Sequence, residues 1–127
     1  MPRLADIRLG TSCFARAREV PCPVSIARSE PAWFKTWQHF RSYKELAPSW
    51  KLIHSSKQGK VSWMEYKAAY QQQVLDGLDP EQVLLQLTQS FGPELTLLCW
   101  EREAEFCHRR LAARWLGRGL GLDIPEL

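Results

Sequence analysis

The stretch Glu94–Arg110, ELTLLCWEREAEFCHRR, decides the fold of this chain. Its residues from Leu95 to Trp100 carry no charge, which is typical of a strand that is buried on both faces, as in a parallel sheet. After the acidic residues that follow, apolar residues from Phe106 to Trp115 recur at helical spacing. A strand, a short acidic loop and a helix form half of an α/β unit.

The predicted helix carries Cys107, His108 and Arg109 in its first turn, and Gly117 and Gly119 are its predicted stop signals. In α/β units, ligands lie beyond the carboxyl ends of the strands and face the amino-termini of the helices. We therefore expect the functional chemistry of the chain at this turn.

The other elements are predicted from local signals. Ser62 and Glu65 form a capping box that predicts a helix over 62–76, and Asp79 with Pro80 opens a second helix that Gly92-Pro93 ends. Alternation and turn residues predict strands over 7–12, 23–28 and 121–126. The segment 29–50, rich in aromatic residues, is expected to hold one helical turn at most.

This order predicts a single α/β domain over residues 1–127. We expect a mainly parallel sheet of about four strands with flanking helices, like half of a Rossmann-like or flavodoxin-like fold. The carboxyl ends of the strands would gather Thr11 and Ser12, in a turn after the first strand, with Arg28, Cys99 and Glu101.

The composition is that of an ordinary globular domain, with 45% hydrophobic residues and a net charge of +3. The chain shows no leader and no apolar run of membrane-spanning length, so no membrane association is expected. Its four cysteines are therefore predicted to be reduced thiols in the cytoplasm. We expect the six tryptophans to pack in the core and its margins. The oligomeric state has no signal in the sequence.

Charge is distributed unevenly along the chain. Residues 1–60 hold 11 of the 17 basic residues and 4 of the 14 acidic ones. The basic aromatic segment 33–51 could stack on and neutralise nucleic acid, which makes a nucleic-acid-binding accessory protein one hypothesis. A solvated surface balanced by the acidic second half is the plainer interpretation.

The leading hypothesis is the binding of a phosphate-bearing small molecule, such as a nucleotide or a nucleic-acid component, with or without its processing. Arg28 and Arg109 would clamp the anion beside the helix amino-terminus. Backbone near Thr11 and Ser12 would approach the ligand, and Glu101 would accept a hydrogen bond from a sugar or base.

The runner-up is a thiol-dependent enzyme. Cys107 at a helix start, beside a cation, is placed where a thiolate nucleophile is favoured, with His108 and Glu101 as further catalytic candidates and Cys99 as a partner. Buried cysteines that act as small hydrophobic residues explain the same pattern.

A metal site is the third hypothesis. Cys99, Cys107 and His108 could supply three ligands, and His54, His39 or Cys13 a fourth. Zinc sites usually contain a close pair of ligands on a tight knuckle, and seven residues separate the two cysteines. We therefore predict no metal, and the sequence identifies no cofactor.

The motif resembles that of the family known as domain of unknown function 488, written LLC-x-E…CHR. Leu97–Glu101 and Phe106–Arg109 carry the resemblance, which extends to Ile26–Arg28, to the segment 43–49 and to Tyr70–Pro80. It covers nearly the whole chain. The resemblance implies an α/β fold and brings no established activity.

By the same resemblance, the motif residues of the family correspond to Cys99, Glu101, Cys107, His108 and Arg109, together with Arg28. Two positions depart from the longer members of the family. Gly10-Thr11-Ser12 stands where they have Gly-His-Ser, and Ile26 stands where they have an aspartate. A mechanism that uses that histidine or that aspartate is not expected here.

Overall fold

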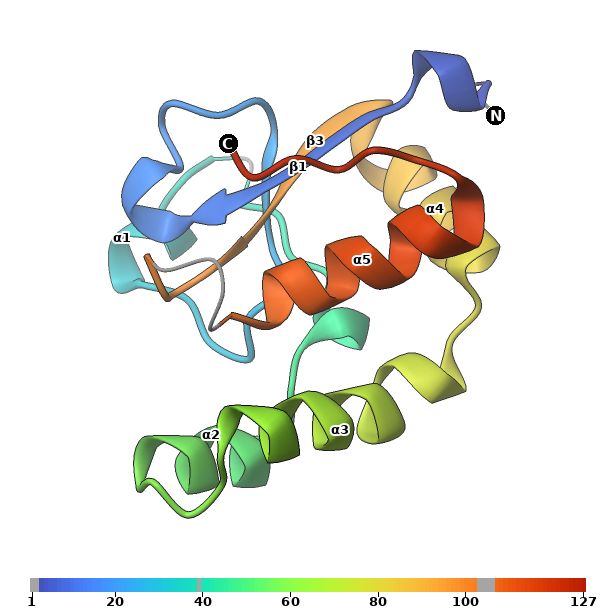
Figure 1. Ribbon diagram of the computed structural model, residues 1–127. Coiled ribbons are helices and arrows are strands. Elements are labelled where there is room, and N and C mark those ends of the chain that lie inside the picture. Colours follow the sequence, from blue (N-terminus) through green and yellow to red (C-terminus); the bar gives the residue numbers. More distant parts are fainter. Residues whose placement is uncertain (1–2, 39, 103–106) are drawn as a thin grey trace.

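The apolar run of the sequence forms β3 (Glu94–Cys99), the central strand of a parallel sheet in which β1 (Arg8–Cys13) and β2 (Pro23–Ser25) lie on either side. The computed structural model describes residues 3–38, 40–102 and 107–127. Within these ranges the fold is α/β, as predicted, with helices packed against the sheet (Figure 1).

The sheet has three strands in the described part of the chain, where about four were predicted. The predicted last strand over 121–126 makes a single parallel bridge, between Glu126 and Thr11. The Thr11 N–H donates to the Pro125 carbonyl at 2.9 Å, and the Leu127 N–H donates to the Thr11 carbonyl at 2.7 Å. Pro125 has no N–H to donate, so the tail cannot extend this pairing into a regular strand.

The predicted N-terminal caps of two helices are confirmed. Ser62 and Glu65 complete a capping box at the start of α3, and the Asp79 side chain accepts the Gln82 N–H at the start of α4. Helix α2 was not predicted, although the Ser49 hydroxyl caps it by accepting the Leu52 N–H. The helices are α1 (Ala32–Lys35), α2 (Trp50–Lys57), α3 (Trp63–Gln73), α4 (Pro80–Phe91) and α5 (His108–Leu120), and the 3-10 turns are η1 (Leu4–Asp6), η2 (Phe14–Arg16), η3 (Lys44–Leu46) and η4 (Leu75–Gly77).

Helix α5 passes through both of its predicted stop signals and ends at Gly121, which adopts a left-handed conformation with φ 67°. A Cβ at Gly119 would lie 2.7 Å from the Pro80 side chain, and one at Gly117 would lie 2.8 Å from the Leu122 carbonyl oxygen. The two glycines therefore do not end the helix. They allow Pro80 and the Leu122 carbonyl to approach its backbone closely.

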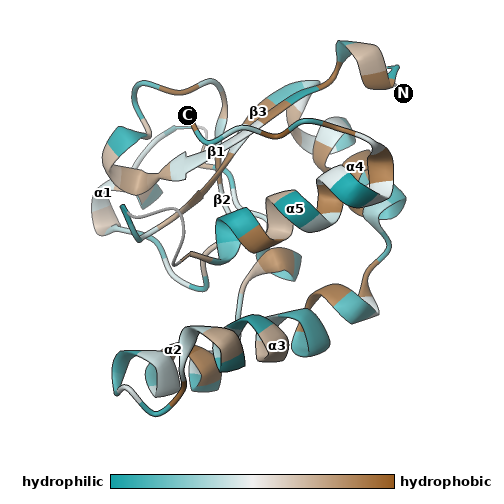
Figure 2. Ribbon diagram, viewed as in Figure 1, coloured by the Kyte–Doolittle hydropathy of each residue, from teal (hydrophilic) through white to brown (hydrophobic). Residues whose placement is uncertain are grey.

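The core has two parts. Leu95 and Leu97 of β3 belong to a large cluster with residues of α3, α4 and α5, whereas Leu98 and Cys99 belong to a smaller one with Phe14 and other residues. Figure 1 shows α5 alongside the sheet and α2 and α3 in an outer layer. Hydrophilic and hydrophobic residues alternate along α5, as expected of a helix with one buried face (Figure 2).

The tryptophans do not all pack as predicted. Three of them are half-buried and pack against the two core clusters, namely Trp37, Trp63 and Trp115. The other three are exposed: Trp33 by 41%, Trp50 by 50% and Trp100 by 51%. The exposed indoles of Trp50 and Trp100 line the same cleft.

Candidate functional site

The carboxyl edge of the sheet gathers the predicted site, because parallel strands end on the same side. Cys13 of β1 pairs in register with Cys99 of β3, and the Ile26 N–H just after β2 donates to the Leu98 carbonyl at 3.0 Å. Helix α5 starts beyond this edge with His108. Residues 103–106 of the predicted acidic loop lie outside the described residues.

Cys99 and Cys107 meet at this edge, and their sulfur atoms form a disulfide. This differs from the predicted reduced thiols, whereas Cys13 and Cys22 are free. Both bonded cysteines are at most 1% exposed. The packing of the start of α5 beside the end of β3 brings them together, although seven residues lie between them in the sequence.

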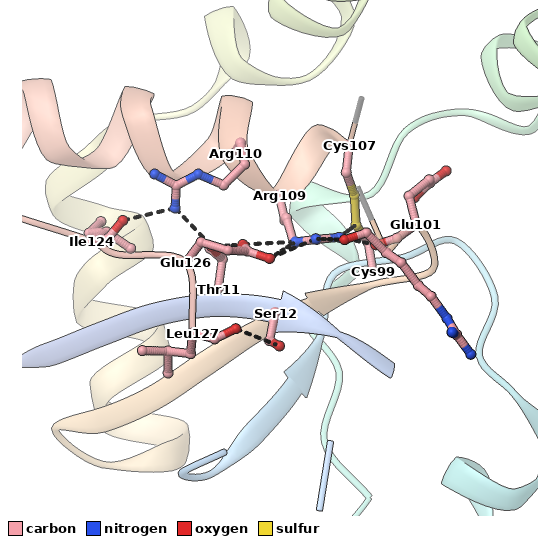
Figure 3. Close-up of polar contacts among 11 residues, drawn as sticks. Thr11, Ser12, Cys99, Glu101, Cys107, Arg109, Arg110, Ile124, Glu126 and Leu127 are labelled. Carbon is pink, nitrogen blue, oxygen red and sulfur yellow. Dashed lines mark hydrogen bonds and ion pairs between the residues drawn. A yellow bond between two sulfur atoms is a disulfide. The ribbon is translucent and has the colours of Figure 1, made fainter. Parts of the chain in front are cut away.

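Arg109 is fully buried and donates to groups of the protein itself. Its Nε and Nη2 atoms bond the Glu126 carboxylate, with the shortest distance 2.7 Å, and its Nη1 atom lies 3.1 Å from the Cys99 Sγ atom (Figure 3). Nη1 and Nη2 also donate to the backbone carbonyls of Glu101 and Arg102. The predicted anion clamp is thus an anchor for the turn between β3 and α5.

Glu126 is the partner that the sequence analysis did not identify, and no spacing or motif in the tail marks it. It accepts hydrogen bonds from Arg109 and, at 2.6 Å, from the Thr11 hydroxyl. Partial burial raises the pKa of Glu126, but these hydrogen bonds and the positive charges of Arg109 and Arg110 outweigh it and hold the pKa below its usual value. The carboxylate is therefore ionised at neutral pH.

Thr11 and Ser12 lie inside β1 and are fully buried, so the turn predicted over Gly10–Cys13 is wrong. The Arg110 guanidinium donates to the Thr11 hydroxyl at 2.8 Å, and the Ser12 hydroxyl donates to the Leu127 carbonyl at 3.3 Å. The tail over residues 124–127 covers both hydroxyl groups (Figure 3). In this structure they hold the tail to the sheet.

His108 is buried at the start of α5. Its Nε2 atom lies 2.8 Å from the Ile26 carbonyl oxygen, and the Tyr70 ring packs beside it with centroids 5.5 Å apart. Burial lowers the pKa of His108 to about 4, and the charge of Arg109 adds to this effect while the Ile26 hydrogen bond opposes it. The imidazole is consequently neutral at neutral pH and donates its Nε2 proton to Ile26.

Arg28 follows β2 and lies at the same edge. Its Nε atom donates to the Pro48 carbonyl at 3.0 Å and its Nη2 atom to the Ala47 carbonyl at 3.2 Å. Lys44 fastens the same segment by donating to the Ala27 carbonyl at 2.7 Å and by pairing with Glu30. These bonds attach the segment 43–50 to the end of β2.

A cleft of about 70 Å³ opens between this edge, α2 and α3. Trp50 and Trp100 are half exposed at the cleft, and the Trp100 Nε1–H donates to the Ser29 carbonyl at 2.8 Å. The exposed Glu101 side chain points away from the Arg109 network (Figure 3). Burial, and then the charge of Glu101, raise the pKa of Tyr66. The cleft is lined by these polar and aromatic residues: Arg28, Ser29, Trp50, Lys57, Tyr66, Trp100, Glu101 and His108.

The residues predicted for the site therefore fall into three groups. Arg28, Glu101 and His108 line the cleft. Cys99, Cys107 and Arg109 form a buried layer next to it, and Thr11 and Ser12 lie under the tail, away from the cleft. Lys57 was missed, because the helix that carries it was not predicted, whereas Trp50 belongs to the segment 33–51 that was predicted to stack on nucleic acid.

A larger hollow of about 600 Å³ lies between α3, α4 and α5. Lys67, Arg114 and Arg118 contribute its positive charge, and Trp115 lies on its wall. It contains none of the residues predicted for the site. The smaller cleft, by contrast, lies at the carboxyl edge of the sheet, where ligands of parallel α/β sheets bind.

Comparison with known proteins matches the chain to a family model. The model of the DUF488-N3a family, described as "Active DUF488-N3 subclade", matches residues 4–119. No curated protein and no solved structure matches the chain. Among the described residues, no helix has the length and apolar character needed to cross a membrane.

Proposed function

The chain belongs to the DUF488-N3a family, and from the geometry of its cleft we propose that it binds a phosphate-bearing small molecule, such as a nucleotide or a nucleic-acid component, at the carboxyl edge of the sheet. The observation that carries this proposal is the meeting of two cations, Arg28 and Lys57, with two exposed indoles, Trp50 and Trp100, around one cleft.

The cations supply the anion site. Arg28 uses its Nε and Nη2 atoms on backbone carbonyls, and in the described part of the chain no group takes its Nη1 donors. Lys57 ends α2 with an exposed ammonium group that has no ion pair among the described residues. Helix α5 adds the positive end of its dipole, because its N-cap residue Cys107 makes no side-chain capping bond. Arg109 takes no part, since its donors are used internally.

The dimensions favour a ligand that lies partly outside the cleft. A cavity of about 70 Å³ is far below the roughly 300 Å³ at which pockets for whole ligands begin, so it encloses one group only. A phosphate group fits this role, and a base or sugar would then lie over Trp50 or Trp100. The Glu101 carboxylate at the rim would accept a hydrogen bond from a hydroxyl or amino group.

The geometry favours this function over the two alternatives. A Cys107 nucleophile would need an accessible thiolate, and Cys107 is 1% exposed with its sulfur bonded to Cys99. In the segment 33–51, Lys44 is paired with Glu30, which weakens the case for a nucleic-acid surface there. A cytoplasmic location stays a prediction.

The test is thermal melting of the purified protein with inorganic phosphate, AMP, ADP, ribose 5-phosphate and, as the phosphate-free comparison, adenosine. A ligand that binds the native state must raise the melting temperature. We expect the phosphorylated compounds to raise it and adenosine to leave it nearly unchanged. A panel in which no phosphorylated compound raises the melting temperature would overturn the proposal.

Two variants of one helix locate the site. Lys57→Glu reverses a charge that lines the cleft, and Lys51→Glu reverses an equally exposed charge on α2 that does not. We expect the first to weaken binding about tenfold, equivalent to one charge-assisted hydrogen bond of about 1.5 kcal/mol, and the second to change it little. Equal effects of the two variants would place the ligand elsewhere.

A further inference from the structure

We propose that Cys99, Cys107 and His108 form a binding site for a divalent transition metal ion, with Zn²⁺ as the best match. The two Sγ atoms and a ring nitrogen of His108 lie within 4.8 Å of one another, and all three residues are buried. This site adjoins the phosphate cleft, which His108 also lines, but it does not depend on the function proposed above.

The fold explains why three ligands meet although their spacing argues against a zinc knuckle. Cys99 is the last residue of β3, Cys107 is the N-cap of α5, and His108 is its first residue. The helix packs back against the strand that precedes it, so its first residues return to the point where the strand ends. Tertiary packing thus supplies the proximity that a knuckle supplies in short zinc motifs.

The backbone separation suits a metal better than a disulfide. The Cα atoms of Cys99 and Cys107 are 7.2 Å apart, whereas disulfides usually join Cα atoms about 4.4–6.8 Å apart. Two zinc–sulfur bonds of about 2.3 Å in tetrahedral geometry hold the sulfur atoms roughly 3.7 Å apart, which bridges a longer gap. When the two cysteines are reduced, a metal ion between their sulfur atoms therefore fits the observed positions of β3 and α5.

A dication would also balance the charges of the two cysteines once they bind it as thiolates. Two thiolates at this site would bring two negative charges into a buried layer. The nearest cation, Arg109, is 3.1 Å from the Cys99 Sγ atom but already balances Glu126 at 2.7 Å. A divalent ion neutralises both thiolates and leaves the Arg109–Glu126 pair intact. The Arg109 Nη1–H then donates a hydrogen bond to the metal-bound Cys99 sulfur.

The hydrogen bond of His108 leaves one of its ring nitrogens free to bind a metal ion. Its Nε2 atom bonds the Ile26 carbonyl, and metal-binding histidines commonly direct their second ring N–H to a carbonyl or carboxylate. That bond places the free lone pair on Nδ1, which is then the ligand atom. Thiolate and imidazole together select zinc over the oxygen-preferring ions Mg²⁺ and Ca²⁺.

The set has three members in the part of the chain that the structure describes. The candidates named from the sequence do not enlarge it: Cys13 stands beside Cys99 in the sheet but outside the set, and His54 is exposed on α2, while His39 lies outside the described residues. Zinc sites with three protein ligands take a water molecule or a substrate as the fourth ligand. Cys13 therefore becomes the control residue.

The test measures metal binding directly. The protein is purified under reducing, oxygen-free conditions, its metal content is determined by mass spectrometry, and the apoprotein is titrated with Co²⁺ as a spectroscopic probe and with Zn²⁺ in competition. We expect one ion per chain, with thiolate-to-cobalt charge-transfer absorption that Zn²⁺ abolishes. Cys99→Ser, Cys107→Ser and His108→Gln should each weaken binding at least a hundredfold, whereas Cys13→Ser should retain it.

Alkylation of the wild-type protein keeps the test decisive if a variant does not fold. Zn²⁺ should protect Cys99 and Cys107 from a thiol reagent, as located by peptide mass spectrometry, and should leave the reactivity of Cys22 unchanged. A reduced protein that binds no metal, or an equal loss of binding in Cys13→Ser, would overturn the proposal. Recovery of Cys99 and Cys107 as a disulfide under the reducing conditions would overturn it as well.

Discussion

Replacement of Arg109 by alanine should destabilise the fold strongly, although the sequence marks this residue as a ligand-binding one. Its side chain is fully buried, and its donors reach the Glu126 carboxylate, the Cys99 sulfur and two backbone carbonyls. Alanine would leave a buried void and remove the guanidinium from all of these acceptors at once.

The magnitude follows from the burial of the two partners. Removal of one member of a buried ion pair costs about 3–5 kcal/mol. The Glu126 side chain remains 30% exposed, so water can reach the carboxylate left behind and the lower end applies, about 3 kcal/mol. With a urea m-value of about 1.5 kcal/mol/M, the unfolding midpoint should fall by roughly 2 M.

Urea unfolding followed by tryptophan fluorescence measures this change. Arg114→Ala is the matched control, because Arg114 is an exposed arginine on the same helix and its loss should cost less than about 0.5 kcal/mol. In a double-mutant cycle, Arg109→Ala combined with Glu126→Ala should cost less than the sum of the single changes. Equal stability of the Arg109 and Arg114 variants would refute the anchoring role and return Arg109 to the ligand site.

Three further changes test other parts of the structure. Because the pKa of Glu126 is lowered on folding, the stability advantage of the wild type over Glu126→Gln should be full above the ordinary pKa of 4.5 and should shrink as the pH falls below it; a pH-independent difference in urea titrations would contradict this. Gly117→Ala places a Cβ 2.8 Å from a backbone carbonyl oxygen and should cost about 1–3 kcal/mol, whereas Gly77→Ala, with no atom within 4 Å, should be nearly neutral in thermal melting. Tyr70→Phe removes the hydroxyl that donates to the buried Leu46 carbonyl at 2.6 Å, and a loss of about 1–2 kcal/mol is expected in urea unfolding, where an unchanged midpoint would speak against this bond.

Local signals in the sequence predicted most of the secondary structure. The uncharged run 95–100 became the central strand, and the caps at Ser62 and Asp79 start the helices they predict, because capping depends on residues three positions apart. Helix α2 has a cap at Ser49, but Leu52 is its one buried residue, so its apolar periodicity was too weak to recognise. The strand predicted over 121–126 does not form, because Pro125 has no N–H to continue the pairing with β1.

The meeting of several candidate residues at one edge of the sheet was predictable, but the bonds that they make were not. Parallel strands bring their carboxyl ends together whatever their side chains, so the approach of Cys99, Cys107 and Arg28 followed from topology. The pairing of donors with acceptors depends on segments that are far apart in the sequence and that no sequence pattern links. The carboxylate of Glu126 reaches Arg109 from the tail, and the carbonyl of Pro48 reaches Arg28 from a segment without regular structure.

Hydrogen-bond partners decide which predicted residues can still meet a ligand. A buried guanidinium whose donors all reach protein acceptors gains nothing from an added anion, so Arg109 holds the turn between β3 and α5. Arg28 has unused Nη1 donors and Lys57 has no ion pair among the described residues, and we therefore propose that these two residues bind the anion. The LLC-x-E…CHR motif contributes Trp100, Glu101 and His108 to the lining of the cleft, and α2, which no motif marks, contributes Trp50, Ile53 and Lys57.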